Sequence, residues 1–303
     1  MTFRQFLLVV EIRTKVISVS TFVLATLYAA SRGATISAAD TVLLAVAVLC
    51  VDMGTTAFNS FYDYLRGVDT PLYTAEPDKV LVHEAVAPGY ALIVSVALYA
   101  LAAVAGIAVA ATTVWWIVPV GIGGMLVGFL YNGGPLPLSR TPFGELFAGG
   151  FLGTVLFLVV YAVHARALTT DALIASIPSS LMIAAVLTVN NTCDYDGDRA
   201  AGRRTLSIVA GRSFGEAIVY ASGLIAYAIL FAGALATVDA LPRLRPGGVV
   251  AAAVGLLVTA AFYLRMHRRG YSHATKRPQM VAIIRVVSIY TAVYAAMLVY
   301  AAV

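Results

Sequence analysis

Nine long apolar stretches follow one another along this chain of 303 residues, and they constrain its architecture more than any other feature. Each has about 18 to 23 residues, enough to cross the hydrocarbon core of a bilayer as one α-helix. Because lipid offers no hydrogen-bond partners, a spanning segment must pair its backbone groups internally, which favours helices. The stretches cover residues 16–33, 41–62, 90–112, 114–131, 143–163, 172–192, 216–238, 247–265 and 280–302.

The composition agrees with an all-α, polytopic membrane protein of nine transmembrane helices. Hydrophobic residues make up 61% of the chain, charged residues only 12%, and the mean hydropathy is +0.90. The net charge of +5 is too small and too dispersed for a nucleic-acid binder. Cys50 and Cys193 form neither a disulfide framework nor a metal-ligand spacing. We therefore expect one membrane domain over residues 1–303, with the lipid bilayer as its first partner.

The distribution of Lys and Arg predicts the orientation. If the N-terminus is cytoplasmic, most basic residues lie in cytoplasmic segments, as the positive-inside rule requires. The opposite segments then contain only Arg32, Arg166, Arg243 and Arg245. Three arginines at the end of the eighth stretch are interpreted as topology and lipid-headgroup anchors: Arg265, Arg268 and Arg269. The sequence thus predicts a multi-pass protein of the cytoplasmic membrane.

Two polar clusters interrupt the apolar pattern, at the ends of the second and sixth stretches. One contains Asn59, Asp63 and Asp69, and the other runs from Asn190 to Asp198. A carboxylate near the bilayer centre costs roughly 2.5 to 3.5 kcal/mol, so it persists where it faces water, a cation or another polar group. Both clusters share an Asn-x-x-x-Asp core and lie on the predicted cytoplasmic side. This repeat predicts two pseudo-symmetric four-helix halves plus one helix, with a shared site between the halves.

Helical spacing groups the polar residues further. One face of the second helix carries Asp52, Asn59 and Asp63. One face of the sixth carries Asn191, Asp194 and Asp198. Asp52, deeper in its helix, is either a ligand or a hydrogen-bonded structural carboxylate, and Asp196 is either a ligand or a solvated loop residue.

The residue types favour a particular cation. Mg²⁺ takes hard oxygen ligands, commonly one or two carboxylates together with phosphate oxygens. With no His or Cys at catalytic spacing nearby, the clusters fit Mg²⁺ bridging to a diphosphate better than a transition metal. Four cytoplasmic basic residues are candidates to hold the remaining diphosphate charge: Arg66, Lys79, Arg203 and Arg204. Metal and basic groups would stabilise the diphosphate as its C–O bond breaks, and an apolar cavity would shelter the allylic cation. The alternative for Arg66 and Asp69 is a solvated turn.

The two clusters resemble the aspartate-rich motifs of the UbiA superfamily of intramembrane prenyltransferases. The first motif is Asn59-Ser-Phe-Tyr-Asp63-Tyr-Leu-Arg66-Gly67-Val-Asp69-Thr70, and the second runs from Asn190 to Leu206. The long second motif, and the segments beginning at Tyr131 and Phe143, are most similar to the menaquinone branch. That branch is typified by 1,4-dihydroxy-2-naphthoate polyprenyltransferase. The resemblance covers nearly the whole chain.

The resemblance implies roles for individual residues. The catalytic Mg²⁺ ligands would be Asn59, Asp63, Asp194 and Asp198, with Asp69 and Asn191 supporting them. The diphosphate would be held by Arg66, Lys79, Arg203 and Arg204. Tyr131 and Asn132 match a polar pair lining the family's active site, whereas Arg13 and Lys15 are candidates to bind the acceptor's acidic group.

Two residues depart from the family pattern. Ser60 stands where an acidic residue is usual, which reduces the charge at the first cluster. Glu84 stands near a position usually held by Gly. Both departures leave the class of acceptor open.

The resulting hypothesis is Mg²⁺-dependent transfer of a polyprenyl group from its diphosphate to an aromatic acceptor of the naphthoate type. Rival interpretations are a terpene cyclase on the same scaffold, and transfer to a sugar phosphate, glycerol derivative or tetrapyrrole. A non-enzymatic rival is an ion-coupled transporter. Diphosphate release without an acceptor would distinguish cyclisation from transfer, and transport would release no diphosphate. Prenyl chain length depends on helix packing that the sequence does not specify.

Overall fold

The computed structural model describes residues 1–69, 79–84, 86–234 and 246–302, and all regular structure within them is helical. Eight helical segments in this part of the chain are long and apolar enough to cross a membrane. The fourth expected stretch corresponds to a shorter apolar helix, α6 (Ile117–Asn132), of 16 residues. The all-α polytopic fold is therefore confirmed, although one of the nine predicted helices falls below spanning length. Thr70, Arg243, Arg245 and the predicted helix end at 235–238 lie outside the described residues.

The chain divides into two compact units. The first unit comprises Met1–Val19 and Ala38–Arg140, and the second comprises Ser20–Ser37 and Thr141–Val303. The division falls within the first long helix, α2 (Val16–Ser31). The predicted symmetry of two four-helix halves plus one helix is consequently not confirmed, because most of α2 belongs to the second unit.

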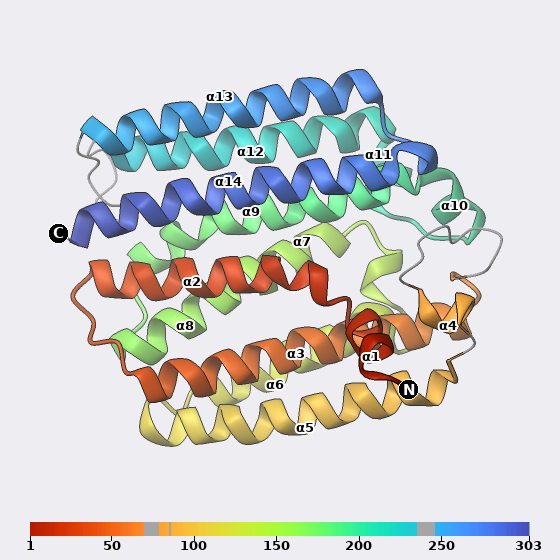
Figure 1. Ribbon diagram of the computed structural model, residues 1–303, viewed down its shortest axis with the longest axis horizontal. Helices are drawn as coiled ribbons and strands as arrows, with labels where there is room; N and C mark the ends of the chain where they lie inside the picture. Colours follow the sequence, from red (N-terminus) through yellow and green to blue (C-terminus); the bar gives the residue numbers. More distant parts are fainter. Residues whose placement is uncertain (70–78, 85, 235–245, 303) are drawn as a thin grey trace. The chain divides into compact units, whose positions relative to one another are not determined.

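Three long helices form the body of the first unit. Here α3 (Ala38–Leu65) packs along α5 (Pro88–Thr112), and both contact α6 (Figure 1). Gly54 permits the close approach of α3 and α5, because a Cβ there would lie 2.6 Å from Cδ1 of Tyr99. The Tyr99 hydroxyl is 2.7 Å from Oγ1 of Thr55 and donates to the carbonyl of Met125 at 3.1 Å. One tyrosine thereby connects all three helices.

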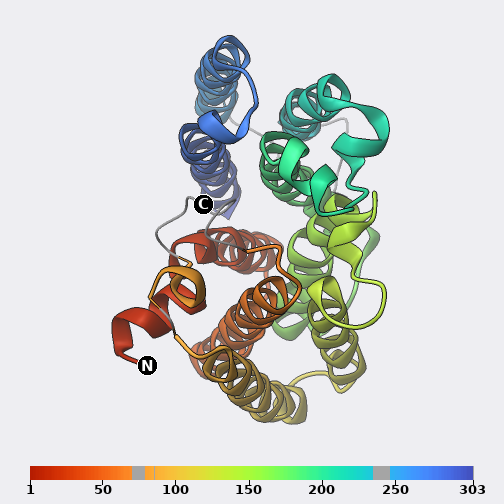
Figure 2. The ribbon, with the colours of Figure 1, turned by 90° about the vertical axis from the view of Figure 1, so that its right-hand side faces the viewer.

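Short helices cover one end of the first unit. They are α1 (Phe3–Val9), η1 (Ile12–Lys15) and α4 (Val80–His83), seen near the N-terminus in Figure 2. Glu84 connects α4 to α1, since its carboxylate accepts hydrogen bonds from Arg4 at 2.6 Å and Gln5 at 3.1 Å. These two bonds lower the pKa of Glu84. The departure at Glu84 thus has a structural explanation within this chain: it fastens the N-terminal helix.

The second unit is organised around α9 (Thr170–Cys193), the most buried of the candidate spans. Its neighbours are α12 (Arg212–Ala234), α14 (Lys276–Ala302), and the segment made of α7 (Gly144–Gly149), the π-helical η3 (Gly150–Val155) and α8 (Leu156–Ala165). Gly149 and Gly153 let this segment approach α9, because a Cβ at either would meet Ser180 or its backbone. Thr154 and Ser180 then hydrogen-bond at 2.6 Å.

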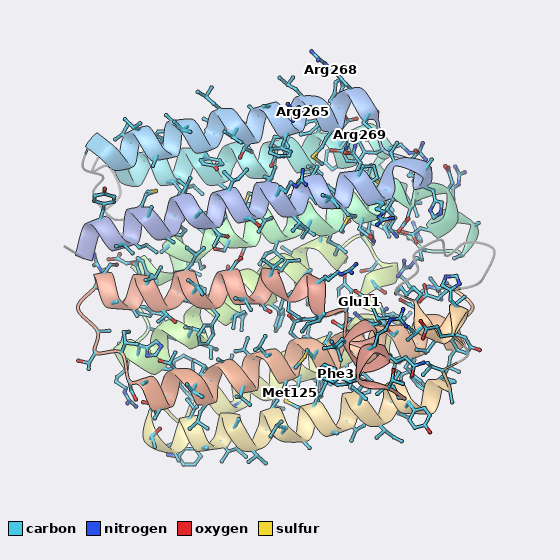
Figure 3. All side chains as sticks on the ribbon, viewed as in Figure 1. Phe3, Glu11, Met125, Arg265, Arg268 and Arg269 are labelled. Carbon is cyan, nitrogen blue, oxygen red and sulfur yellow. The ribbon has the colours of Figure 1, made fainter. Side chains whose placement is uncertain are left out.

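The remaining helices of the second unit lie at its edges. They are α13 (Pro246–Arg269), which packs against α12 and α14, and the short α10 (Tyr195–Ala200), α11 (Leu206–Ala210) and η4 (His273–Thr275). Arg265, Arg268 and Arg269 are exposed at the C-terminal end of α13 (Figure 3). Their anchoring role stays a prediction.

Candidate functional site

The first polar cluster is shaped by the way α3 ends. After Leu65 the chain turns through Gly67, whose φ of +64° is readily adopted only by glycine. The N–H of Val68 donates to the carbonyl of Asp63 at 2.9 Å, and that of Gly67 to Tyr64 at 3.2 Å. These are the two hydrogen bonds of a Schellman C-cap. The cap folds the loop back so that Asp69 returns toward the end of α3.

Asp63 is held by the end of α6. Nδ2 of Asn132 donates to Oδ2 of Asp63 at 2.8 Å. Arg66 fixes the same junction, because its guanidinium donates to the backbone carbonyls of Asn132 and Gly134 and lies over the ring of Tyr62. These contacts join α3 to α6, and the diphosphate-binding role expected for Arg66 stays a prediction.

Lys79 lies between two carboxylates of the first unit. Its Nζ is 3.2 Å from Oδ2 of Asp69 and 3.3 Å from Oε1 of Glu11. Burial acts to lower the pKa of Lys79, but Glu11, Asp69 and Asp63 together raise it. The ammonium therefore stays charged, as a diphosphate-binding group requires. The partner Glu11 was not expected from the sequence.

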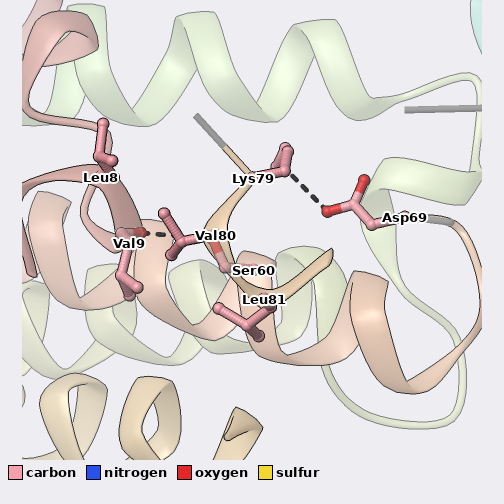
Figure 4. Close-up of a pocket in the computed structure, with 7 residues that line it drawn as sticks. All are labelled: Leu8, Val9, Ser60, Asp69, Lys79, Val80 and Leu81. Carbon is pink, nitrogen blue, oxygen red and sulfur yellow. Dashed lines mark hydrogen bonds and ion pairs between the residues drawn. The ribbon is translucent and has the colours of Figure 1, made fainter. Parts of the chain in front are cut away.

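A small pocket adjoins this ion pair (Figure 4). It is lined by Leu8, Val9, Ser60, Asp69, Lys79, Val80 and Leu81. The Ser60 hydroxyl donates to the carbonyl of Val9 at 3.3 Å, so it points to the end of α1. An acidic side chain at position 60 would set a carboxylate against that carbonyl. The hydrogen bond to α1 therefore explains why this chain has Ser60 where the family pattern has an acidic residue.

Lys15 forms a buried ion pair with Asp52. Its Nζ is 2.6 Å from Oδ1 of Asp52 and also donates to Oγ1 of Thr56 at 2.6 Å. The Ser18 hydroxyl donates to the other carboxylate oxygen at 2.5 Å. Of the two interpretations of Asp52, this network supports the structural carboxylate. Arg13, the other candidate for the acceptor's acidic group, is exposed.

The second cluster ends in the same type of cap as the first. Gly202 has a φ of +71°, the N–H of Arg203 donates to the carbonyl of Asp198 at 2.9 Å, and that of Gly202 donates to Arg199 at 3.1 Å. In both clusters an aspartate is followed by glycine four residues later. The backbone carbonyl of that aspartate accepts a hydrogen bond from the N–H of the residue after the glycine. The Asp-x-x-x-Gly spacing is the sequence signal for this shared local structure.

Basic residues contact two aspartates of the second cluster. Nη1 of Arg203 is 2.8 Å from Oδ1 of Asp198, and burial nevertheless raises the pKa of Asp198 while Arg203 opposes the shift. Nζ of Lys276 is 2.7 Å from Oδ2 of Asp194, with Nδ1 of His273 at 3.6 Å from Oδ1. Lys276 was not singled out as a site residue from the sequence, since nothing in it connects α14 to the motif.

Asn191 contacts a carboxylate that the sequence did not assign. Its Nδ2 donates to Oε1 of Glu145 at 2.8 Å, and both side chains are buried. Glu145 lies in α7, inside the segment that carried part of the family resemblance. Asp196, in contrast, is exposed and paired with Arg212 at 2.8 Å, which favours the solvated interpretation. Arg204 is exposed, and Tyr131 is half-buried beside Asn132.

The donor atoms fit a hard cation. Within the described residues, four side-chain oxygens in the two clusters or in residues that contact them are buried without a hydrogen-bond partner: Asn59 Oδ1, Asn132 Oδ1, Glu145 Oε2 and Asp198 Oδ2. All are carboxylate or amide oxygens, the ligand types that Mg²⁺ prefers. No group of three or more His, Cys, Asp and Glu residues is placed to hold a metal in the described part of the chain. A cation here would therefore draw on amide as well as carboxylate oxygens.

The fold and these clusters define an all-helical membrane protein with two oxygen-rich helix ends. The sequence pattern of the UbiA prenyltransferase family matches residues 18–301, and the chain belongs to this family. The superfamily resemblance is thereby confirmed.

Individual relatives match part of the chain. It is 34% identical over 179 residues to 1,4-dihydroxy-2-naphthoate octaprenyltransferase of Bacillus subtilis, covering 59% of this chain and 57% of that protein. It is 30% identical to human UbiA prenyltransferase domain-containing protein 1, in a match that covers 56% of this chain and 50% of that protein. The match thus spans about half the length of these curated relatives.

Solved structures share the fold at low identity. A UbiA homologue from Archaeoglobus fulgidus bound to GPP and Mg²⁺ has a TM-score of 0.67 at 14% identity, over 97% of this chain and 99% of that one. A UbiA homologue from Aeropyrum pernix K1 has a TM-score of 0.65 at 20% identity, over 91% and 97%.

Proposed function

We propose that this protein transfers a polyprenyl group from a prenyl diphosphate to an aromatic acceptor, with Mg²⁺ as cofactor. The observation that carries the proposal is the set of buried, unpartnered oxygens in the two polar clusters (Asn59 and Asp198) and in the side chains that contact them or their neighbours (Asn132 and Glu145). Membership of the prenyltransferase family supports the reaction class. The Bacillus relative supports 1,4-dihydroxy-2-naphthoate as the acceptor, and hence a role in menaquinone biosynthesis.

The two clusters are proposed to share the diphosphate. Asn59, Asp63, Asp194 and Asp198 would hold Mg²⁺, supported by Asp69 and Asn191. Bound Mg²⁺ supplies positive charge that neutralises the diphosphate as it departs. Lys79 would bind the diphosphate directly, a role supported by its partly exposed side chain and its raised pKa. Arg203 and Arg204 would supplement it.

The chemistry follows from the substrate. The C–O bond of the allylic diphosphate breaks, and the electron pair leaves with the diphosphate. An electron-rich ring carbon of the acceptor attacks the allylic cation, forming the new carbon–carbon bond. When that carbon carries a carboxylate, loss of CO₂ returns an electron pair to the ring, so no strong protein base is needed. The apolar helix faces would exclude water from the cation.

Other residues would position this machinery. Asn132 orients Asp63 through its amide, and Arg66 holds the end of α6 against α3, so both act on the geometry of the first cluster. Lys15 lies in a satisfied buried network, which supports a structural role more than binding of the acceptor. Arg13 remains a candidate for the acceptor's acidic group.

The setting of the reaction is also proposed. The candidate spans and the distribution of basic residues support a multi-pass protein of the cell membrane, with a cytoplasmic N-terminus and a site facing the cytoplasm. A prenyl donor would then enter from the lipid with its diphosphate at the cytoplasmic surface.

Incubation of purified protein with Mg²⁺, a labelled prenyl diphosphate and a panel of acceptors tests the proposal. We expect a prenylated naphthoquinol product that requires both Mg²⁺ and the acceptor. Diphosphate release with a cyclic hydrocarbon product and no acceptor would instead identify a terpene cyclase. Cation-coupled flux through vesicles without diphosphate release would identify a transporter.

A further inference from the structure

The carboxylate of Glu145 is buried and only half satisfied. The residue is 4% exposed, in the first turn of α7. Oε1 accepts the hydrogen bond from Asn191, but Oε2 has no hydrogen-bond partner among the described residues. Leaving a charged oxygen buried and unpaired is costly, and the cost exceeds that of a neutral group. The second oxygen is therefore expected to bind a hydrogen-bond donor or a cation.

Asp198, in α10 of the same unit, presents the same pattern. The residue is 5% exposed, Oδ1 is bound by Arg203, and Oδ2 has no hydrogen-bond partner in the described chain. The charge of Asp198 also acts on Glu145. Two buried carboxylates that interact electrostatically repel one another unless a proton or a cation lies between them. One cation would satisfy both unpartnered oxygens.

Asn191, near the C-terminal end of α9, contacts Glu145. Its Nδ2 donates to Glu145, so its Oδ1 is the group that remains to accept or to coordinate. Asn191 is itself 5% exposed. The hydrogen bond fixes the amide plane, as groups around metal ligands commonly do. Glu145, Asn191 and Asp198 are thus three buried residues of the second unit, and the first two contact each other.

We propose that Glu145 is a ligand of the divalent cation in the second cluster, in addition to Asn191 and Asp198. The proposal rests on the Mg²⁺ dependence proposed above. The alternative is that Glu145 only orients Asn191. In a second alternative, Glu145 is protonated and neutral. The variant Glu145→Gln reproduces both alternatives, because glutamine keeps an acceptor for Asn191 and removes the charge.

The test measures Mn²⁺ binding to the purified full-length protein in detergent, without any substrate. Electron paramagnetic resonance of free Mn²⁺ gives the dissociation constant and the number of bound ions. We expect Glu145→Gln to weaken binding at least tenfold or to remove one bound ion, and Asp198→Asn to do the same. Asp171→Asn is the matched control: Asp171 lies at the opposite end of α9, paired with Arg32, and its substitution leaves Mn²⁺ binding unchanged.

Thermal unfolding provides a second readout. We expect Glu145→Gln in EDTA to be as stable as the parent protein or more stable, because a repulsion is removed. Its stabilisation by Mn²⁺ is expected to be smaller than that of the parent. Parent-like Mn²⁺ affinity and stabilisation in Glu145→Gln, with the expected loss in Asp198→Asn, would overturn the assignment of Glu145 alone. No saturable Mn²⁺ binding by the parent protein would overturn the proposed cofactor as well.

Discussion

The buried pair of Lys15 and Asp52 gives the most quantitative prediction. The two side chains are 5% and 13% exposed, and the ammonium has three contacts: Oδ1 of Asp52, the Asp52 carbonyl and Oγ1 of Thr56. Lys15→Met leaves the carboxylate buried with only the Ser18 hydroxyl. Removal of one partner from a buried ion pair costs about 3–5 kcal/mol, and the small residual exposure favours the lower end, about 3 kcal/mol.

The double variant Lys15→Met/Asp52→Leu tests the reasoning behind that magnitude. Both hydroxyls that contact the pair retain a backbone acceptor: Ser18 bonds to the carbonyl of Lys15 at 3.1 Å, and Thr56 to that of Asp52 at 3.0 Å. Replacing both charges with apolar side chains is therefore expected to bring the stability within about 1 kcal/mol of the parent protein.

Equilibrium unfolding of the purified protein in mixed micelles measures both variants. A cost below 1 kcal/mol for Lys15→Met, or a double variant as unstable as the sum of the single ones, would refute the account of a satisfied structural pair. The KM for the acceptor supplies an independent check. A stable double variant with a raised KM for the acceptor would indicate that Lys15 contributes to binding of the acceptor.

Three further predictions concern the first and second clusters. Asp63→Asn or Asp194→Asn should abolish most prenyl transfer while the thermal unfolding temperature changes little, and retained turnover in both would contradict the proposed metal ligands. Lys79→Met should raise the apparent KM for the prenyl donor, and an unchanged value would place the ammonium outside the diphosphate site. Gly67→Ala should lower the free energy of unfolding by about 1 kcal/mol, because Gly67 has a positive φ. Gly106→Ala, in an open helical position, should leave the stability unchanged or raise it. Equal effects of the two substitutions in unfolding experiments would contradict the cap.

The helices were the predictable part of this protein. Stretch length and hydropathy placed each long apolar helix, because the bilayer requirement acts on local composition. The helix boundaries differ from the predicted ones where the residues at a helix end, and not the mean hydropathy, determine where the helix begins. Thus α6 begins at Ile117, directly after Trp115 and Trp116, instead of at residue 114. The predicted symmetry was not confirmed, because the division into units depends on packing and falls within α2.

The two polar clusters could be located from the sequence, but their contacts could not. Asn and Asp spacing identified the two clusters, and the glycines at 67 and 202 explain how each loop turns. The pairing of Lys276 with Asp194 and of Glu145 with Asn191 joins residues that are distant in the sequence. Such contacts, and the oxygens left unpartnered beside them, follow only from tertiary packing.

The proposed function requires that both clusters bind one and the same diphosphate. Titration of a non-reactive prenyl thiolodiphosphate in the presence of Mg²⁺, followed by calorimetry, tests it most directly in the parent protein, Asp63→Asn and Asp194→Asn. The account predicts one bound ligand per chain, and loss of most affinity in either variant. Two ligands per chain, or binding in each variant as tight as in the parent protein, would contradict it.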